Sequence, residues 1–131
     1  MKLSVGKKDE STKFYNMIHW QSGEMPHIPY WASIFNYYLS DDLEGYAEYD
    51  EKTLYAAKEQ PGFLGYESFK YESRGSFISY WRSEADMAEW ARHPLHREAK
   101  ELGVKRWYHY YHSLLARVET QRFHGNSHQE D

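Results

Sequence analysis

The sequence predicts an α+β fold in which a strand, a helix, two strands, a second helix and a last strand follow one another. Two aromatic-rich runs between residues 60 and 81 are joined by a short loop, and a capped helical segment comes directly after them. A further aromatic and β-branched run at residues 30–39 precedes a segment with helical spacing. This order predicts a ferredoxin-like βαββαβ arrangement, with a four-stranded antiparallel sheet and both helices on one face.

The first strand and the first helix are expected at residues 30–39 and 43–59. Residues 30–39 (YWASIFNYYL) are of types that favour strands. The side chains of Ser40-Asp41-Asp42 offer caps for the helix, whose apolar residues recur at spacings of three, four and seven. Asp50 interrupts this apolar stripe. Either its carboxylate is satisfied by Arg117, Lys52 or a Tyr hydroxyl or faces a wet cavity, or the helix is rotated and exposes it.

The second and third strands are expected at residues 63–71 and 76–81. Gln60-Pro61-Gly62 ends the first helix, because proline cannot continue its hydrogen-bond ladder. A period-two pattern rich in aromatic residues follows. The segment Glu72-Ser73-Arg74-Gly75 is expected to form a hairpin loop, which makes the two strands antiparallel.

The second helix and the last strand are expected at residues 84–92 and 104–119. Ser83 followed by Asp86 is similar to a capping box and predicts the helix start. Pro94 kinks the helix or starts a new one. Gly103 is expected to stop the helix, and the many Tyr, Trp and Val residues behind it favour one long strand.

The composition excludes several functional classes. The chain has 131 residues, a formal net charge of −4 and no cysteine. Acidic and basic residues are interspersed, which argues against a nucleic-acid groove. The lack of cysteine excludes disulfides, thiolate metal sites and cysteine nucleophiles. Because no apolar run approaches the ~20 residues that span a membrane, we expect a cytoplasmic protein without a membrane partner.

One domain is expected at residues 30–119. Residues 1–29 are predicted to form an N-terminal extension that is partly disordered, and residues 120–131 a polar C-terminal tail. Aromatic residues occur on both sides of the predicted strands, so the sheet face without helices needs a cover. An identical subunit provides it most simply, which predicts a homodimer.

Several motifs resemble the antibiotic biosynthesis monooxygenase domain family, and in particular its small bacterial members without an assigned substrate. These motifs are Gly45-Tyr46-Ala47-Glu48, residues 60–68 (QPGFLGYES), residues 78–83 (ISYWRS), Trp90, His93, His96, Trp107-Tyr108 and residues 116–119 (ARVE). The resemblance covers about residues 30–119. It implies a dimeric ferredoxin-like α+β barrel with a pocket between helices and sheet in each subunit. Some members of the family are cofactor-independent oxygenases of polyketide quinones and others bind and open haem, so the resemblance implies a fold more directly than a reaction.

The haem-degrading branch implies an Asn on the first strand, a Trp on the second helix and an axial His about ten residues after that Trp. Asn36 lies in the first strand, with its register open, and Trp90 matches the helix position. Lys100 stands ten residues after Trp90, and its ammonium must lose a proton before it can coordinate iron. We therefore expect no cofactor and keep haem as the alternative.

The candidate catalytic residues are His93 and His96. His93 precedes Pro94 and is expected at a helix junction, with His96 three residues further on. The two rings are close enough in sequence for a metal pair, but no third ligand is nearby, so we expect no metal and favour proton transfer or ligand contact.

The candidate ligand-binding residues share a planar or amide side chain. They are Asn36, Tyr66, Trp81, Trp90, Trp107 and Tyr108. The aromatic ones could stack on a planar polycyclic ligand, although each one alone is more typical of a core. We expect a cofactor-independent monooxygenase of an aromatic or polycyclic small molecule. The alternatives are a haem-binding or haem-degrading protein and a non-catalytic dimeric stress or structural protein.

Overall fold

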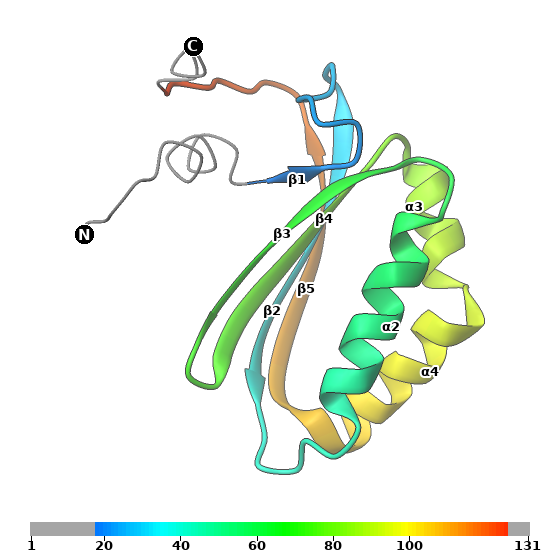
Figure 1. Cartoon of the computed structure of the whole chain (residues 1–131), viewed down its shortest axis with the longest axis vertical. Helices are drawn as coiled ribbons and strands as arrows, with labels where there is room; N and C mark the ends of the chain where they lie inside the picture. The colour runs from blue at the N-terminus through cyan, green and yellow to red at the C-terminus, as the bar shows by residue number, and fades with distance from the viewer. Residues whose placement is uncertain (1–17, 126–131) are drawn as a thin grey trace.

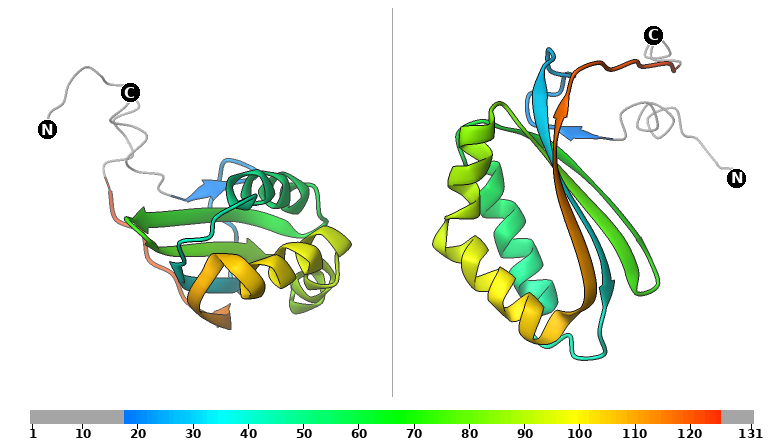
Figure 2. Two further views of the ribbon diagram at one scale, coloured as in Figure 1. Left: turned by 90° about the horizontal axis from the view of Figure 1, so that it is seen from below. Right: turned by 180° about the vertical axis from the view of Figure 1, so that it is seen from behind.

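The computed structural model describes residues 18–125, in which one antiparallel sheet is covered by helices on one face (Figures 1 and 2). The elements in chain order are β1 (His19–Trp20), β2 (Tyr30–Leu39), α2 (Tyr46–Lys58), β3 (Phe63–Tyr71), β4 (Arg74–Trp81), α3 (Glu84–Ala91), α4 (Pro94–Leu102), the π-helical turn η1 (Gly103–Trp107) and β5 (Tyr108–Val118). The predicted order of strands and helices is confirmed, and η1 continues α4 directly.

The sheet has five strands in the order β1-β3-β4-β2-β5, and every neighbouring pair is antiparallel. The four strands β3, β4, β2 and β5 form the predicted ferredoxin-like sheet. The short strand β1 extends it at the β3 edge, where His19 pairs with Tyr66. Dimerisation is not shown by a single chain and stays a prediction.

The central strand β2 determines which side chains face the helices. Ile34 pairs with Ile78 on β4 and with Leu114 on β5, so these three side chains share one face. The neighbouring residues Ser33, Phe35 and Tyr37 point to the opposite face, because successive side chains in a strand alternate. This second face lies under α2, α3 and α4 (Figure 2).

The core lies at the end of the helix layer where β4 leads into α3. It consists of Ala57, Phe63, Trp81, Met87 and Trp90. Trp81 is fully buried, with 0% of its surface exposed. Its indole Nε1 donates to Ser79 Oγ over 2.9 Å, which satisfies the buried N–H. A fully enclosed side chain cannot touch a ligand, so Trp81 is a core residue and its expected role in ligand binding is corrected.

The start of α2 differs from the prediction. The helix begins at Tyr46, and Gly45 precedes it in the left-handed conformation with φ 80°. Ser40 does not cap the helix, because its hydroxyl donates to the Arg106 carbonyl and accepts from the Asp42 amide. Ser40 thus links the segment between β2 and α2 to η1 and takes no part in the start of α2.

Residues 104–107 are helical and not part of the last strand. Gly103 has right-handed helical angles, φ −61° and ψ −46°, and so does not stop the helix. The π-helical turn brings the Trp107 indole Nε1 to the Glu44 carbonyl, to which it donates over 2.8 Å. This long-range bond outweighs the local strand preference.

The β3–β4 hairpin is tighter than predicted. Only Glu72 and Ser73 connect the strands, and Glu72 takes a positive φ of 58°. Gly75 lies within β4, opposite Tyr37, whose ring occupies the space that a Cβ at residue 75 would need. The glycine therefore makes room for the Tyr37 ring and does not form the turn.

The helix starts at Ser83 and Pro94 are confirmed. Ser83 Oγ accepts from the Asp86 amide over 3.1 Å at the start of α3. His93 caps α4, with Nδ1 accepting from the Leu95 amide over 3.1 Å and Pro94 in the first turn.

The segments outside the sheet meet at one end of the molecule. Gln121 accepts from the Tyr30 hydroxyl over 2.6 Å and donates to the Pro26 carbonyl over 2.9 Å. The expected disorder of residues 1–13 and most of the predicted tail lie outside the described residues. Within residues 18–125, no helix combines the length and the apolar character that crossing a membrane would require.

Candidate functional site

A cavity of about 520 Å³ lies between the sheet and the helix layer. Its walls come from β2, β3, β4 and β5 on one side and from α2, α3 and α4 on the other. Cavities of this size accept small organic ligands, and they are typically lined by apolar and aromatic side chains with a few polar groups. The cavity is open to solvent and is therefore accessible to a ligand.

One end of the cavity is apolar. It is formed by Ala57 from α2 and by Met87 and Trp90 from α3, all of which are buried. Trp90 in turn stacks on Trp81, with ring centroids 6.4 Å apart and an angle of 23° between the planes. The expected ligand contact Trp90 thus lines the cavity and rests on the core.

Phenol side chains gather at the opposite end, near the start of α2. Tyr37 lies on β2, Tyr46 on α2 and Tyr108 at the start of β5, and all three line the cavity. The Tyr37 and Tyr108 rings are 5.4 Å apart, and Phe35 lies 5.0 Å from Tyr108. Burial raises the pKa of Tyr37, Tyr46 and Tyr108, and a hydrogen bond to Tyr37 raises the pKa of Tyr46 further. The three phenols are therefore protonated hydrogen-bond donors at neutral pH.

Asp50 on α2 lies in this cluster of phenols. Asp50 lines the cavity and is also exposed to solvent, so of the alternatives that the sequence left open both the cavity-facing and the exposed position describe it. Lys52 and Arg117 do not pair with it, because their salt bridges go to Glu48 and Glu119. Within residues 18–125, no Lys or Arg nitrogen comes within 4.0 Å of the Asp50 carboxylate.

Burial and charge act on the pKa of Asp50 in opposite directions. Burial raises the pKa of the Asp50 carboxyl, and the ammonium group of Lys70 on β3 offsets part of that increase. The negative charge of Asp50 in turn raises the pKa of Tyr37, Tyr46 and Tyr108. The Lys70 Nζ also lies 5.5 Å from the centre of the Tyr46 ring. One carboxylate, one ammonium and three phenols therefore act on one another at this end of the cavity.

The two candidate catalytic histidines are placed differently. His96 lines the cavity and His93 is not among the lining residues. Both rings pack against Trp90, with centroid distances of 5.1 Å. His93 uses Nδ1 as the helix cap. His96 Nδ1 is buried without a hydrogen-bond partner, and burial lowers the pKa of His96, which a hydrogen bond with the Ala91 backbone partly offsets.

The remaining candidate ligand contacts divide between the two faces of the sheet. Tyr66, Trp107 and Tyr108 line the cavity. Tyr66 is fixed by His19, which stacks on it at 4.7 Å and 18°. Asn36 lies between the inward-facing Phe35 and Tyr37 and so points to the sheet face without helices. The structure therefore does not bring Asn36 to the cavity.

Two histidines and one lysine are the candidates for an axial ligand to haem. Nδ1 of His93 accepts from the Leu95 amide, and Nδ1 of His96 is buried without a hydrogen-bond partner. Lys100 lines the cavity, and an ammonium must lose a proton before it can coordinate iron. Within the described part of the chain, no three His, Cys, Asp or Glu side chains are arranged to hold a metal ion.

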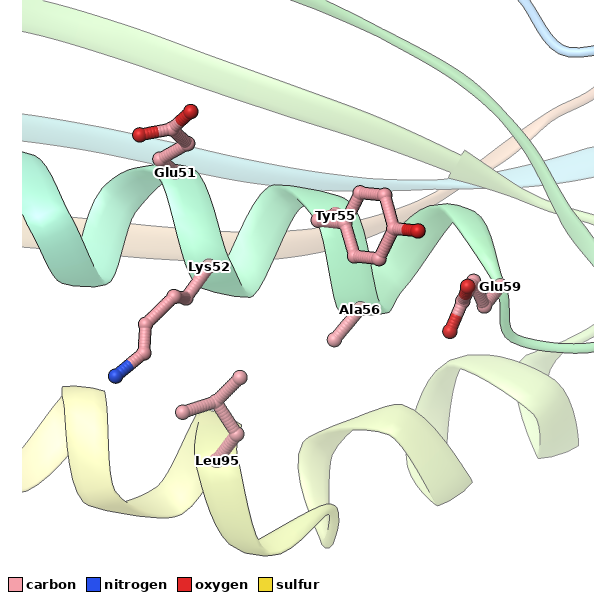
Figure 3. Close-up of a pocket in the computed structure, with 6 residues that line it drawn as sticks. All are labelled: Glu51, Lys52, Tyr55, Ala56, Glu59 and Leu95. Carbon is pink, nitrogen blue, oxygen red and sulfur yellow. The ribbon is translucent and has the colours of Figure 1, made fainter.

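A second hollow of about 430 Å³ lies on the outer side of the helix layer (Figure 3). It is lined by five residues of α2, namely Glu51, Lys52, Tyr55, Ala56 and Glu59, and by Leu95 of α4. Its charged side chains are of both signs and belong to an ordinary exposed helix face. The candidate site is the inner cavity, which gathers a carboxylate, an ammonium and three phenols at one end.

Sequence reasoning found the apolar end of the site better than the phenolic end. Tyr37, Tyr46 and Lys70 were not singled out, although the alternation in β2 and β3 contains a signal for two of them. Once Phe35 and Tyr66 face the helices, Tyr37 and Lys70 must do so as well. Tyr46 is part of the motif at residues 45–48, but its contact with Tyr37 is not visible in the sequence.

The chain is similar to proteins of one family. The family described as antibiotic biosynthesis monooxygenase matches residues 41–102. The uncharacterized protein YqjZ from Bacillus subtilis (strain 168) is 41% identical over 98 residues, which are 74% of this chain and 86% of that protein.

Two solved structures have the same fold. SnoaB, a cofactor-independent oxygenase from Streptomyces nogalater, aligns with a TM-score of 0.61 at 9% identity, over 70% of this chain and 95% of its own. A protein from Shewanella oneidensis aligns with a TM-score of 0.61 at 9% identity, over 70% of this chain and 92% of its own. At these identities the likeness to solved structures shows the fold alone.

Proposed function

The chain belongs to the antibiotic biosynthesis monooxygenase family, and we propose that it is a cofactor-independent monooxygenase of an aromatic or polycyclic small molecule. The observation that carries this proposal is the cavity of about 520 Å³ with an apolar end and a phenolic end. SnoaB, which shares the fold, is a cofactor-independent oxygenase.

The proposed reaction uses the substrate itself as the reductant of oxygen. A base removes a proton from an electron-rich ring system, and the resulting carbanion donates an electron to O₂. Combination of the radical pair forms a carbon–oxygen bond, the peroxide takes up one proton, and loss of water leaves a carbonyl. In sum, a ring CH₂ group and O₂ give C=O and H₂O. The protein contributes a cavity that holds the substrate, a base and hydrogen-bond donors for the anion.

Two residues of α3 offer a matched pair for testing the site. Both are exposed, but Ala88 lines the cavity and Ala85 does not. We expect purified protein, treated with a chelator and supplied with no flavin or nicotinamide, to consume O₂ with an anthrone and to form the quinone. Ala88→Trp fills the cavity and should lower this rate at least tenfold, whereas Ala85→Trp should leave it unchanged. Quinone formation no faster than in buffer, or equal rates for the two variants, would contradict the proposal.

Haem binding is the alternative function, and visible absorbance tests it. We propose that the protein uses no cofactor, because His93 does not line the cavity and Lys100 stands where the haem-degrading branch has its axial His. A haem titration followed by visible absorbance should give no stoichiometric Soret shift. A shift that disappears in His96→Ala would instead identify a haem-binding protein. The third alternative, a non-catalytic protein whose pocket is filled by side chains, is at odds with the open cavity.

We also propose that an identical subunit covers the sheet face without helices. Large apolar side chains on that face are exposed, namely Tyr38 (40%), Phe69 (49%), Tyr110 (53%) and Leu114 (40%). Exposed apolar patches of this kind are typical of interfaces. Leu114→Glu should therefore shift the protein from dimer to monomer in light scattering. Tyr55→Glu, which changes an exposed residue of the helix layer, should not.

A further inference from the structure

The cluster of titratable groups at the phenolic end of the cavity has a composition suited to proton abstraction. We propose that Asp50 is the general base of this site and that Lys70 and the phenols of Tyr37, Tyr46 and Tyr108 stabilise the substrate anion. This inference rests on the proposed function. It assigns the acid–base chemistry to Asp50 and not to His93 or His96.

The carboxylate of Asp50 is available to a ligand. It lines the cavity, and the cations nearest to it in sequence are bound elsewhere, Lys52 to Glu48 over 3.7 Å. Its acceptor oxygens have no Lys or Arg nitrogen within 4.0 Å in the part of the chain that the structure describes. The side chain is exposed at the open cavity, and its partial burial among the lining residues raises the pKa of Asp50, while the Lys70 ammonium offsets part of that increase. This is the direction that a general base requires.

Lys70 keeps the charge of the cluster balanced through the proton transfer. Before the transfer the cluster holds one carboxylate and one ammonium. Afterwards Asp50 is neutral, and the substrate anion takes its place as the negative partner of Lys70. The reaction thus moves a negative charge within the cavity and creates none, which avoids the cost of a new unpaired charge in a low-dielectric site.

The phenols can donate hydrogen bonds to the negative charge of the substrate anion. Burial raises the pKa of Tyr46 and Tyr108, so both keep their hydroxyl protons at neutral pH. They come from α2 and from β5, and Tyr37 comes from β2, so the donors approach from both walls of the cavity. Preorganised donors of this kind stabilise a developing oxyanion more than a neutral ground state.

The histidines are less suited to this role. His96 has its Nδ1 buried, and burial lowers its pKa, which weakens it as a base. His93 caps α4 and does not line the cavity. The other titratable groups that line the cavity are Tyr46 and Tyr49 on α2, Tyr37 on β2, Tyr66 and Lys70 on β3, Glu84 on α3, His96 and Lys100 on α4, and Tyr108 and Tyr111 on β5. Among these only Glu84 and His96 are of types that change charge between about pH 3 and 8, so they are the competing candidates for the base.

The position of Asp50 also indicates the substrate class. The acidic group must lie among the phenols, while fused rings extend toward Met87 and Trp90 at the apolar end. An anthrone or a phenol with an enolisable ring carbonyl has this polarity. Asp50 takes one proton from it, the carbanion reacts with O₂, and the Asp50 carboxylic acid returns the proton to the peroxide before water leaves.

The first arm of the test measures proton transfer without turnover. Alizarin is a dihydroxyanthraquinone whose visible band moves to longer wavelength when a phenol ionises. We expect wild-type protein to bind it as the anion at a pH where free alizarin is neutral, and Asp50→Asn to bind it as the neutral phenol. Glu51→Gln, on the outer face of the same helix, should bind the anion as wild type does. Failure of wild type to bind alizarin, or binding of the anion by Asp50→Asn, overturns the proposal.

The second arm measures anthrone oxidation. Asp50→Asn should lower kcat by about 10²–10⁴ and remove the loss of rate on the acid side of the pH profile. Glu51→Gln, the next residue on the same helix but on its outer face, should retain the wild-type rate and profile. A wild-type protein that ionises alizarin through Asp50 but oxidises no anthrone would refute the proposed function and leave the base assigned. Loss of oxidation in His96→Gln with wild-type rates in Asp50→Asn would overturn the assignment alone.

Discussion

The hydrogen bond between Trp81 and Ser79 should contribute measurably to stability. Both residues lie on β4, two positions apart, so their side chains share the face toward the helices. Trp81 has 0% exposed surface, and its Nε1 donates to Ser79 Oγ over 2.9 Å. Ser79→Ala removes the acceptor and leaves the indole N–H without a partner in the core. An unsatisfied buried donor costs about 1–3 kcal/mol, so we expect the free energy of unfolding to fall by that amount.

A double-mutant cycle separates this bond from the packing of the indole. Trp81→Phe removes the donor and part of the buried ring, which should cost about 1–3 kcal/mol. The double variant lacks both partners, so no unsatisfied indole N–H remains. It should therefore be less destabilised than the sum of the two single variants by about 1 kcal/mol.

Urea unfolding followed by tryptophan fluorescence and circular dichroism gives the four free energies. The midpoints should move while the slopes stay equal, since the exposed area on unfolding hardly changes. Ser113→Ala is the matched control, because Ser113 lines the same cavity from β5 but is exposed, and it should cost less than about 0.5 kcal/mol. If Ser79→Ala cost no more than Ser113→Ala, or if the single effects added within about 0.3 kcal/mol, the reasoning would be refuted.

Three further perturbations test the packing and electrostatics of the fold. In Gly75→Ala the new methyl group overlaps the Tyr37 ring, so thermal unfolding should show a loss of about 1–3 kcal/mol, and wild-type stability would mean that the ring is not held there. The pKa of Asp50 is raised in the folded state, so the folded protein keeps this proton to a higher pH than the unfolded chain does. The free energy of unfolding therefore falls as the pH rises from the pKa of the unfolded state, about 3.9, to the pKa of the folded state. Asp50→Asn should therefore be more stable than wild type in urea at pH 7 and lose this advantage near pH 3, and an advantage independent of pH would contradict the stated cause. In Ser83→Ala the Asp86 amide loses its cap, so urea unfolding should show a loss of about 1 kcal/mol, and a loss no larger than that of Ser113→Ala would speak against the cap.

The elements that could be predicted from sequence are those whose signal is local. The strand at residues 63–71 and the cap at Ser83 depend on neighbours within a few positions, and both are confirmed, although a register shift between Phe63 and Gly65 interrupts the predicted alternation. The helix start at Pro94 is likewise a property of that residue and of His93 before it. Local physics was sufficient for the order of the elements and therefore for the fold.

The elements that were predicted incorrectly depend on partners that are distant in sequence. Ser40 has the side chain of a helix cap, but its hydroxyl bonds to Arg106, 66 residues away. Residues 104–107 have strand-forming side chains, yet Trp107 bonds to Glu44, 63 residues away. Ser40 bonds to η1, and Trp107 of η1 bonds to the segment before α2. The local sequence preference of each residue can therefore be interpreted only when this tertiary contact is known.

The site shows the same division between local and distant causes. Trp90 could be placed at the cavity from its helix position, and the histidines stood out because their chemistry is versatile. The sequence does not show that the nitrogens of His93 and His96 are taken up or enclosed by the helix junction itself. Asp50 stood out for the opposite reason, as a residue that breaks a pattern.

An acidic residue on an apolar helix stripe is evidence of function only if its carboxylate makes no interaction that stabilises the fold. Asp50 has no close Lys or Arg partner among the described residues, and partial burial raises the pKa of its carboxyl. An Asn at this position would serve the packing of α2 at least as well. A carboxylate that lines a cavity beside Lys70 and three phenols without a close cation departs from the rules of packing at one place, and such places are where binding and catalysis are expected. The stability test at pH 7 and pH 3 therefore bears on the site as well as on the fold, because a carboxylate with no stability penalty would remove this argument for Asp50.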